Sequence, residues 1–115
     1  MAAIGVTGTM AGRAVLAESV RTSDVVSRVG GEEFLLILPG ASADSARRKV
    51  DKIRETLKKL ELFHRGRRLP VLTFSAGVAA FPANGETGEE LLRVSDKALY
   101  EAKHAGRDRA VIAGV

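Results

Sequence analysis

A pair of glycines, Gly30 and Gly31, separates two short runs of strand-forming residues. The first run, residues 24–29, is rich in valine, and the second, residues 33–38, is a continuous apolar run that ends at Pro39. Because glycine enters positive φ at no steric cost, two such runs joined in this way predict an antiparallel β-hairpin. The rest of the chain must therefore build a sheet around this hairpin.

Two segments downstream of the hairpin have the periodicity of amphipathic helices. In the first, apolar residues recur at spacings of four and three, which predicts one buried stripe; they are Ala46, Val50, Ile53, Leu57 and Leu60. In the second, Thr87 and Glu90 form a capping box at the start, and Gly106 is the expected stop.

The remaining segments complete the expected order of elements. Residues 69–78 predict a strand whose even-numbered side chains share one face, and residues 110–113 predict a last strand. Residues 14–21 predict a short helix, and residues 63–68 predict a loop. The order helix, strand, strand, helix, strand, helix, strand indicates an α+β fold, with an antiparallel sheet covered by helices.

Composition excludes several classes of protein. The chain of 115 residues has no cysteine, so it holds no disulfide, thiol nucleophile or cysteine-ligated zinc. Its two histidines, His64 and His104, lack the spacing of a metal site. No apolar run is long enough to cross a bilayer, and the N-terminus has no basic signal region, so we expect a cytoplasmic segment without membrane contact.

The basic charge of the chain invites a nucleic-acid interpretation, which we do not favour. Residues 46–68 hold ten Lys and Arg against three acids, a net charge of +7. Aromatic residues make up only 4% of the chain, however, and no stacking platform is visible. A solvated helix face is the better interpretation, and we expect no nucleic-acid partner.

The hairpin carries the residues with the most specific chemistry. Two glycines let backbone N–H groups approach a phosphate, and the adjacent carboxylates of Glu32 and Glu33 could hold Mg²⁺ together with substrate phosphates. The alternative is an ordinary solvated turn with a capping acid. On these residues alone the ordinary turn is the more frequent case.

Further motifs in the sequence favour the functional interpretation of the hairpin over the ordinary turn. The sequence GGEEF at residues 30–34, preceded by RTSD at residues 21–24, resembles the GGDEF family of diguanylate cyclases. Residues 72–78, LTFSAGV, are similar to the family's T-x-S-x-G-V strand. Residues 95–108 are similar to its A-D-x-A-L-Y-x-A-K-x-x-G-R-N helix. The resemblance covers residues 8–113, so we expect residues 1–115 to form a single partial GGDEF domain with an atypical start at residues 1–7.

The resemblance implies both a fold and a reaction. The fold is a nucleotide-cyclase-like (ferredoxin-like) α+β fold with an antiparallel-rich sheet and flanking helices. The reaction is the condensation of two GTP molecules to cyclic di-GMP, a signal-transduction step that releases pyrophosphate. Each 3′-hydroxyl attacks the α-phosphate of the other nucleotide, which implies a two-fold homodimer and a divalent metal ion, Mg²⁺ or Mn²⁺.

The resemblance also implies roles for single residues. Glu32 is the expected metal ligand and Glu33 its catalytic neighbour, while Gly30 and Gly31 give the backbone access to phosphate. These roles come from the match to the signature motif and not from the hairpin pattern.

Two cations near the end of the last helix complete the expected substrate site. By resemblance, Lys103 and Arg107 bind the terminal phosphates of GTP. They lie four residues apart, which on one helix is one face. The alternative is that they are ordinary cations that favour the helix dipole in a last turn.

A second site is implied by Arg21 and Asp24, which match the family's RxxD inhibitory site for product. Lys52 occupies the place of a further basic contact, and a lysine cannot form the planar fork of an arginine, so product binding should be weaker. The alternative is an Asp that caps a turn beside an exposed Arg.

The match breaks down near the N-terminus. Residues 8–16 align with the family's G-H-x-x-G-D-x-x-L, with Thr9 in place of the histidine and Arg13 in place of an aspartate that helps to recognise guanine. The family's D-x-D-x-F-K-x-x-N-D strand should precede Gly8, but only seven residues remain there and none is acidic. The first metal-ligating aspartate is therefore missing, and we expect weak activity or none.

The missing strand normally lies in the middle of the sheet, where its absence would leave backbone groups unpaired. We expect either that residues 2–6 serve as a substitute strand or that two chains pair or swap elements across the exposed edge. The alternative function is a catalytically dead cyclic di-GMP receptor or dimerisation scaffold that retains the product site.

Overall fold

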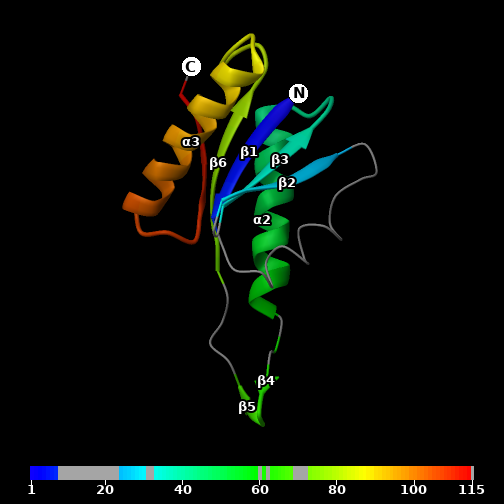
Figure 1. The fold of residues 1–115 in the computed structure, drawn as a ribbon, viewed down its shortest axis with the longest axis vertical. Helices are drawn as coiled ribbons and strands as arrows, with labels where there is room; N and C mark the ends of the chain where they lie inside the picture. Colours follow the sequence, from blue (N-terminus) through cyan, green and yellow to red (C-terminus); the bar gives the residue numbers. More distant parts are fainter. Residues whose placement is uncertain (8–23, 31–32, 60, 62, 69–72, 115) are drawn as a thin grey trace.

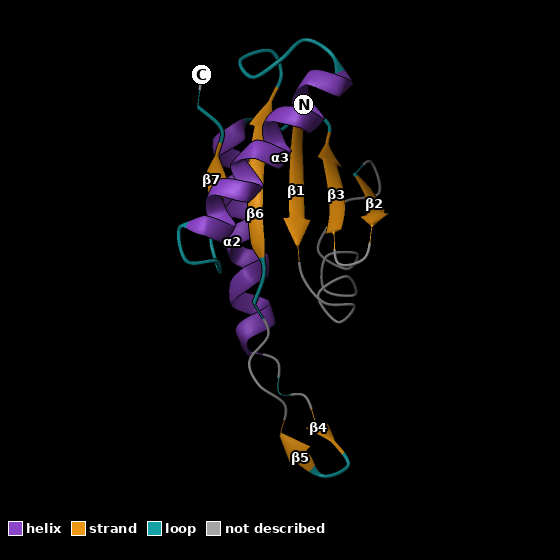
Figure 2. Cartoon of the chain, turned by 60° about the vertical axis from the view of Figure 1, so that its left-hand side comes forward, coloured by secondary structure: helices purple, strands orange, loops and turns teal. Residues whose placement is uncertain are grey.

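The computed structural model describes residues 1–7, 24–30, 33–59, 61, 63–68 and 73–114. A sheet of five strands runs in the order β2-β3-β1-β6-β7, and two helices pack against it (Figure 2). The strands are β1 (Ala2–Thr7), β2 (Val25–Gly30), β3 (Glu33–Leu38), β6 (Ser75–Ala80) and β7 (Ala110–Ile112). The helices are α2 (Ala43–Lys59) and α3 (Gly88–His104). This arrangement confirms the expected α+β fold.

The predicted hairpin is present. Strands β2 and β3 pair antiparallel, with a register shift between Arg28 and Gly30, and Gly30 is paired with Glu33. The residues between these two partners lie outside the described part of the chain. All neighbouring strands are antiparallel except β6 and β7, which are parallel. The sheet is therefore mixed, and not wholly antiparallel.

Strand β1 occupies the centre of the sheet, between β3 and β6 (Figure 2). Its register is continuous on both sides: Gly5, for example, lies opposite Leu35 of β3 and Gly77 of β6. The prediction that residues 2–6 serve as a substitute strand is confirmed, and the backbone groups at the middle of the sheet are paired.

The two helices cover opposite faces of the sheet (Figures 1 and 2). The predicted stripe of α2, including Val50 and Ile53, packs into a core with Ile4, Leu36 and Val78. Its last predicted member, Leu60, lies outside the described residues. On the other face, Leu91 and Ala98 of α3 pack with alanines of β1 and β6. Strand β6 follows the predicted alternation, since its even-numbered residues face α2 and its Gly77 lies against α3.

The caps of α3 follow the predicted chemistry. The Thr87 side chain accepts a hydrogen bond from the Glu90 backbone N–H at 3.1 Å. The Glu90 carboxylate in turn accepts one at 2.9 Å from the N–H of Glu86, the residue before the N-cap, where a capping box uses the N–H of the N-cap itself. Gly106 follows the C-cap residue Ala105 with φ of 119°, so the predicted helix stop is confirmed.

Some predicted boundaries were wrong. Of the strand predicted over 69–78, residues 69–72 lie outside the described residues, residues 73–74 precede β6, and the strand continues to Ala80. Residues 63–68 form a small hairpin of β4 (Phe63–His64) and β5 (Arg67–Arg68), where a loop was predicted (Figure 1). The positive φ of Arg65 (53°) and Gly66 (79°) is that of a two-residue hairpin turn, which explains the pairing. The helix predicted over 14–21 lies outside the described residues.

Candidate functional site

The start of β3 places Glu33 at an open part of the sheet. In the strand, Glu33 lies opposite Thr7 of β1 and alternates with the buried Phe34, so its side chain belongs to the face that α3 covers. The helix lies over β1, β6 and β7, and Leu35 on β3 is only half-buried. The Glu33 side chain is accordingly 49% exposed.

Lys103, in the last turn of α3, reaches this carboxylate. Its Nζ lies 3.4 Å from Oε1 of Glu33, which joins residues 70 apart in the sequence. Because the pair is partly solvated, it contributes little stability. It shows instead that the end of α3 and the base of the hairpin share one surface, which we call the open face: Glu33, Asp96 and Lys103.

Asp96 is the member of the open face that the sequence analysis missed. It lies seven residues before Lys103, and its Oδ1 is 3.6 Å from where a Cβ on Gly5 would stand. Partial burial raises the pKa of Asp96, the charge of Glu33 raises it further, and the charge of Lys103 opposes both. Asp96 and Lys103 both belong to the motif at residues 95–108, seven residues apart and hence on one helix face. This spacing was the signal that could have identified Asp96.

Arg107 does not lie on the helix, so the prediction that it shares a helix face with Lys103 is wrong. Helix α3 ends at His104, and Arg107 follows Gly106 in a left-handed conformation with φ of 61°. Its N–H donates to the Ala102 carbonyl at 3.0 Å, the closing bond of a Schellman-type turn. Within the described residues its side chain makes no hydrogen bond or ion pair.

Part of the predicted nucleotide site falls outside the described residues. Gly31 and Glu32 lie there, as does Arg21 of the product site. Gly30 is the last residue of β2 and is paired with Glu33. The roles expected for these residues therefore stay predictions.

Two of the three residues predicted for the product site, Asp24 and Lys52, lie in the described part of the chain. Asp24 is buried, and its Oδ2 forms an ion pair with Nζ of Lys49 at 3.2 Å. Lys52 is exposed and lines a groove of about 550 Å³ with Arg48, Lys49, Ile53 and Thr56. The structure thus joins the basic helix face to Asp24 through Lys49, which the sequence analysis did not single out.

No described residues form a group of three or more His, Asp or Glu side chains that could hold a metal ion. Strand β1 offers no carboxylate, and the described carboxylate at the hairpin, Glu33, is paired with Lys103. In the described parts of the chain no helix is long and apolar enough to span a membrane.

Comparison with known proteins gives a consistent result. The family model "Diguanylate cyclase, GGDEF domain" matches residues 11–109. Diguanylate cyclase DgcP of Pseudomonas aeruginosa is 39% identical over 98 residues, which is 85% of this chain and 14% of DgcP. Response regulator PleD of Caulobacter vibrioides is 38% identical over 98 residues, 84% of this chain and 21% of PleD. The chain thus spans less than a quarter of either relative.

Solved structures agree with the fold. The GGDEF domain of DgcB from Caulobacter crescentus, in complex with c-di-GMP, superposes with a TM-score of 0.89 at 24% identity, covering 99% of this chain and 76% of that one. An EAL/GGDEF domain protein from M. capsulatus has a TM-score of 0.83 at 26% identity, covering 99% of this chain and 84% of that one.

Proposed function

This chain belongs to the GGDEF family of diguanylate cyclase domains, and from that membership we propose that its open face binds GTP for condensation to cyclic di-GMP. The observation that carries the proposal is the 3.4 Å contact between Lys103 and Glu33. It brings a cation for phosphate and the acidic signature segment to one surface from opposite ends of the chain. We take residues 1–115 as one such domain.

Each residue of the proposed site has a role that its chemistry supports. Lys103 and Arg107 bind the terminal phosphates, since a charge-assisted hydrogen bond from either cation favours an anionic oxygen. Gly30 and Gly31 leave room for the phosphate to approach the backbone. Glu32 and Glu33 supply the acidic groups beside the triphosphate.

The reaction requires two copies of the site. The 3′-hydroxyl oxygen of one GTP forms a bond to the α-phosphorus of the other, the bond to the bridging oxygen breaks, and pyrophosphate leaves. The hydroxyl proton passes to solvent or to a nearby carboxylate. When both nucleotides react in this way, two domains face each other about a two-fold axis, so we propose that the active form is a homodimer.

The described residues do not fit a resident metal ion. Diguanylate cyclases use a divalent metal, and Mg²⁺ binds through one or two carboxylates together with substrate phosphates. Here the open face has the carboxylates of Glu33 and Asp96, β1 adds none beside them, and no described residues form a group of three that could hold the ion. We therefore derive no step through a metal held by these residues, and we propose that this chain makes cyclic di-GMP slowly or not at all.

A second function, binding of cyclic di-GMP without synthesis, is favoured by the basic groove on α2. Three cations, Arg48, Lys49 and Lys52, line its volume of about 550 Å³ beside the Asp24–Lys49 ion pair. A phosphodiester ligand fits such a surface because several cations can share its charge. We propose that Arg21, Asp24 and Lys52 belong to this product site.

Calorimetric titration with GTP in Mg²⁺ buffer, and separately with cyclic di-GMP, distinguishes the two functions. We expect Lys103→Ala to weaken GTP binding about tenfold, the loss of one charge-assisted hydrogen bond, and to leave cyclic di-GMP binding unchanged. Lys97→Ala, on an exposed position of the same helix, is the control for charge. GTP binding that is equal in the two variants would remove the open face as the site.

Turnover is tested by a gain of function. Thr7 lies directly opposite Glu33 in the β1–β3 pair, so Thr7→Asp adds a carboxylate from β1 to the two that the open face already has, Glu33 and Asp96. We expect this variant to form more cyclic di-GMP from GTP than the parent in Mn²⁺ or Mg²⁺ buffer. Thr7→Asn is the matched control, since it has the same size without the charge. Equal product in both variants would mean that the missing carboxylate is not what limits turnover.

A further inference from the structure

We infer that Asp108, held by Arg54 and Lys58 of α2, is a positioning residue for Arg107. The inference rests on the proposed function in one respect, that Arg107 binds phosphate. Nothing in the family resemblance assigned a role to Asp108, and this chain has an aspartate where the family pattern has an asparagine.

The turn that carries Arg107 needs support from outside. Three consecutive residues have positive φ: Gly106 at 119°, Arg107 at 61° and Asp108 at 45°. Residues other than glycine rarely adopt this conformation, and it persists only where surrounding contacts hold it. Two such residues in succession therefore require a specific restraint.

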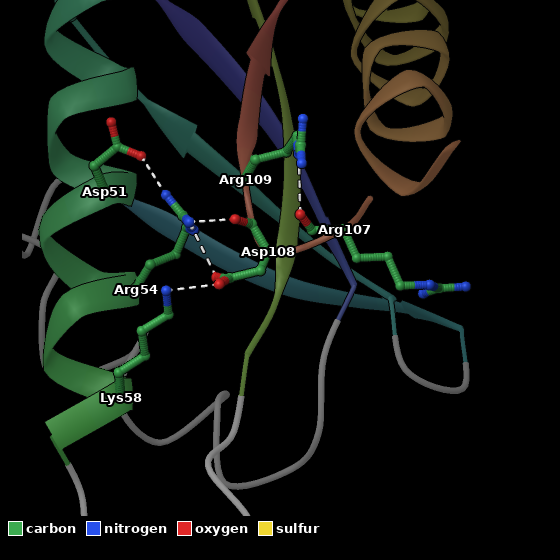
Figure 3. Close-up of polar contacts among 6 residues, drawn as sticks. All are labelled: Asp51, Arg54, Lys58, Arg107, Asp108 and Arg109. Atoms are coloured by element: carbon green, nitrogen blue, oxygen red, sulfur yellow. Dashed lines mark hydrogen bonds and ion pairs between the residues drawn. The ribbon is translucent and has the colours of Figure 1, made fainter. Parts of the chain in front are cut away.

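Helix α2 supplies that restraint (Figure 3). The Arg54 Nη2 donates to the Asp108 carbonyl and, at 3.0 Å, to its Oδ1. Nζ of Lys58 lies 2.6 Å from Oδ2 of the same carboxylate. Asp51 holds the other end of the Arg54 guanidinium at 2.7 Å. Because the Arg54 side chain is only 17% exposed, these contacts are stronger than those of an ordinary surface pair.

The restraint fixes the backbone of Arg107 and leaves its side chain free. The Arg107 N–H donates to Ala102, and its carbonyl accepts from Nε of Arg109 at 3.0 Å. Its guanidinium points away from the Asp108 contacts (Figure 3). The residue is exposed, and its side chain has no hydrogen-bond or ion-pair partner among the described residues. Because the backbone is already fixed, Arg107 loses only side-chain freedom when it binds an anion, which favours affinity.

The competing explanation is that the Asp108 contacts only attach the end of the sheet to α2. Strand β7 begins two residues later at Ala110, and the Arg109 carbonyl already accepts from the Ala76 N–H at 2.9 Å. A purely structural role would lower stability without acting through Arg107. A double-mutant cycle separates the two explanations, because a residue that acts through Arg107 has no further effect once Arg107 is removed.

The experiment measures two quantities on the whole chain: the Kd for GTP in Mg²⁺ buffer, and the hydrogen-exchange rate of the Arg107 backbone amide. The variants are Arg107→Ala, Asp108→Ala, and the two combined. Asp108→Asn and Lys58→Ala are milder variants in case Asp108→Ala, which leaves Arg54 without this partner, does not fold. Asp44→Ala is the control for net charge, since Asp44 forms only exposed pairs with Arg47 and Arg48.

We expect Asp108→Ala to weaken GTP binding about tenfold, as Arg107→Ala does, and to have no further effect in the combined variant. The Arg107 amide should exchange faster in Asp108→Ala and at the parent rate in Asp44→Ala. Asparagine readily adopts left-handed conformations, so Asp108→Asn should retain most of the amide protection and lose part of the affinity.

The inference is overturned if the effects of Asp108→Ala and Arg107→Ala on Kd multiply, or if Asp108→Ala leaves both Kd and exchange at the parent values. If the parent chain binds no GTP, the proposed function is refuted, and this result by itself does not test the inference about Asp108. The exchange rates then decide the inference, since they report on the Arg107 backbone without any nucleotide.

Discussion

The close approach of α3 to β6 at Gly77 makes the sharpest prediction for stability. A Cβ at Gly77 would lie 2.2 Å from the Leu99 backbone N and 2.3 Å from the Ser95 carbonyl oxygen. Real Cβ atoms keep at least 3.0 Å from such neighbours, so Gly77→Ala must displace α3 by 0.8 Å or more. Both obstacles are helix backbone, which cannot move aside as a flexible side chain would.

The cost of this displacement follows from the packing that it disrupts. Moving a helix by nearly 1 Å forfeits a quarter to a half of the dispersion attraction at its contacts, and overpacking alone costs about 1–3 kcal/mol. We expect Gly77→Ala to lower the free energy of unfolding by about 3 kcal/mol. For a domain of this size that loss lowers Tm by about 12 °C.

Gly5 provides the matched control, because it lies directly opposite Gly77 in the β1–β6 register. A Cβ at Gly5 would find its nearest neighbours at 3.6 Å, an ordinary contact distance. Gly5→Ala should therefore leave stability unchanged or raise it by up to about 1 kcal/mol, since alanine restricts the unfolded chain.

Thermal unfolding followed by far-ultraviolet circular dichroism measures both variants, since the chain has no tryptophan to report by fluorescence. A Gly77→Ala variant that melts with the parent, or a Gly5→Ala variant that falls as far, would refute the reasoning. The glycine of the SAGV motif, Gly77, thus has a structural role: it lets α3 approach the sheet closely, and this role requires no contact with a ligand.

Three further predictions concern single side chains. Thr87→Ala removes the α3 N-cap and should cost about 1 kcal/mol in chemical denaturation, whereas Thr56→Ala, inside α2, should cost little; equal losses would contradict this. Partial burial and the charge of Glu33 raise the pKa of Asp96, so its charged form is disfavoured in the fold, although solvent screens the effect at this exposed residue. Asp96→Asn should therefore be slightly more stable than the parent at neutral pH. This difference in stability should vanish as the pH falls below the ordinary range of aspartate, and a difference that stays constant with pH would contradict the prediction. Asn84→Ala removes side-chain hydrogen bonds to the end of β6 and to the C-terminal segment, and should lower stability by about 1–2 kcal/mol; an unchanged Tm would show that water replaces them.

Features of the fold that depend on neighbouring residues were predictable from the sequence. The apolar stripe of α2 and the capping box of α3 are set within a few positions, and both are present. The hairpin of β4 and β5 was missed because its strands have two residues each, too few for a periodic pattern. Its turn residues, Arg65 and Gly66, were the available signal.

Contacts between distant segments were not predictable from periodicity. Lys49 forms an ion pair with Asp24, 25 residues away in the sequence, and the charge of Glu33 raises the pKa of Asp96. Both interactions exist because the sheet and the helices bring these segments together. The error on Arg107 has a local cause. A spacing of four residues means one face only inside a helix, and the stop expected at Gly106 already placed Arg107 beyond the helix.

Strand β1 shows that the pairing of a strand and the chemistry of its side chains have separate requirements. Strand pairing uses backbone groups, so the residues Ala2–Thr7 form both ladders without any particular side chain. The core requires only apolar volume on one face, which Ile4 and Val6 supply. A metal ligand instead requires an oxygen-bearing side chain at one register position. A superposition of backbones does not detect whether that side chain is present. The likeness in fold therefore extends to β1, and it carries no information on the side chains that the proposed condensation of GTP would need there.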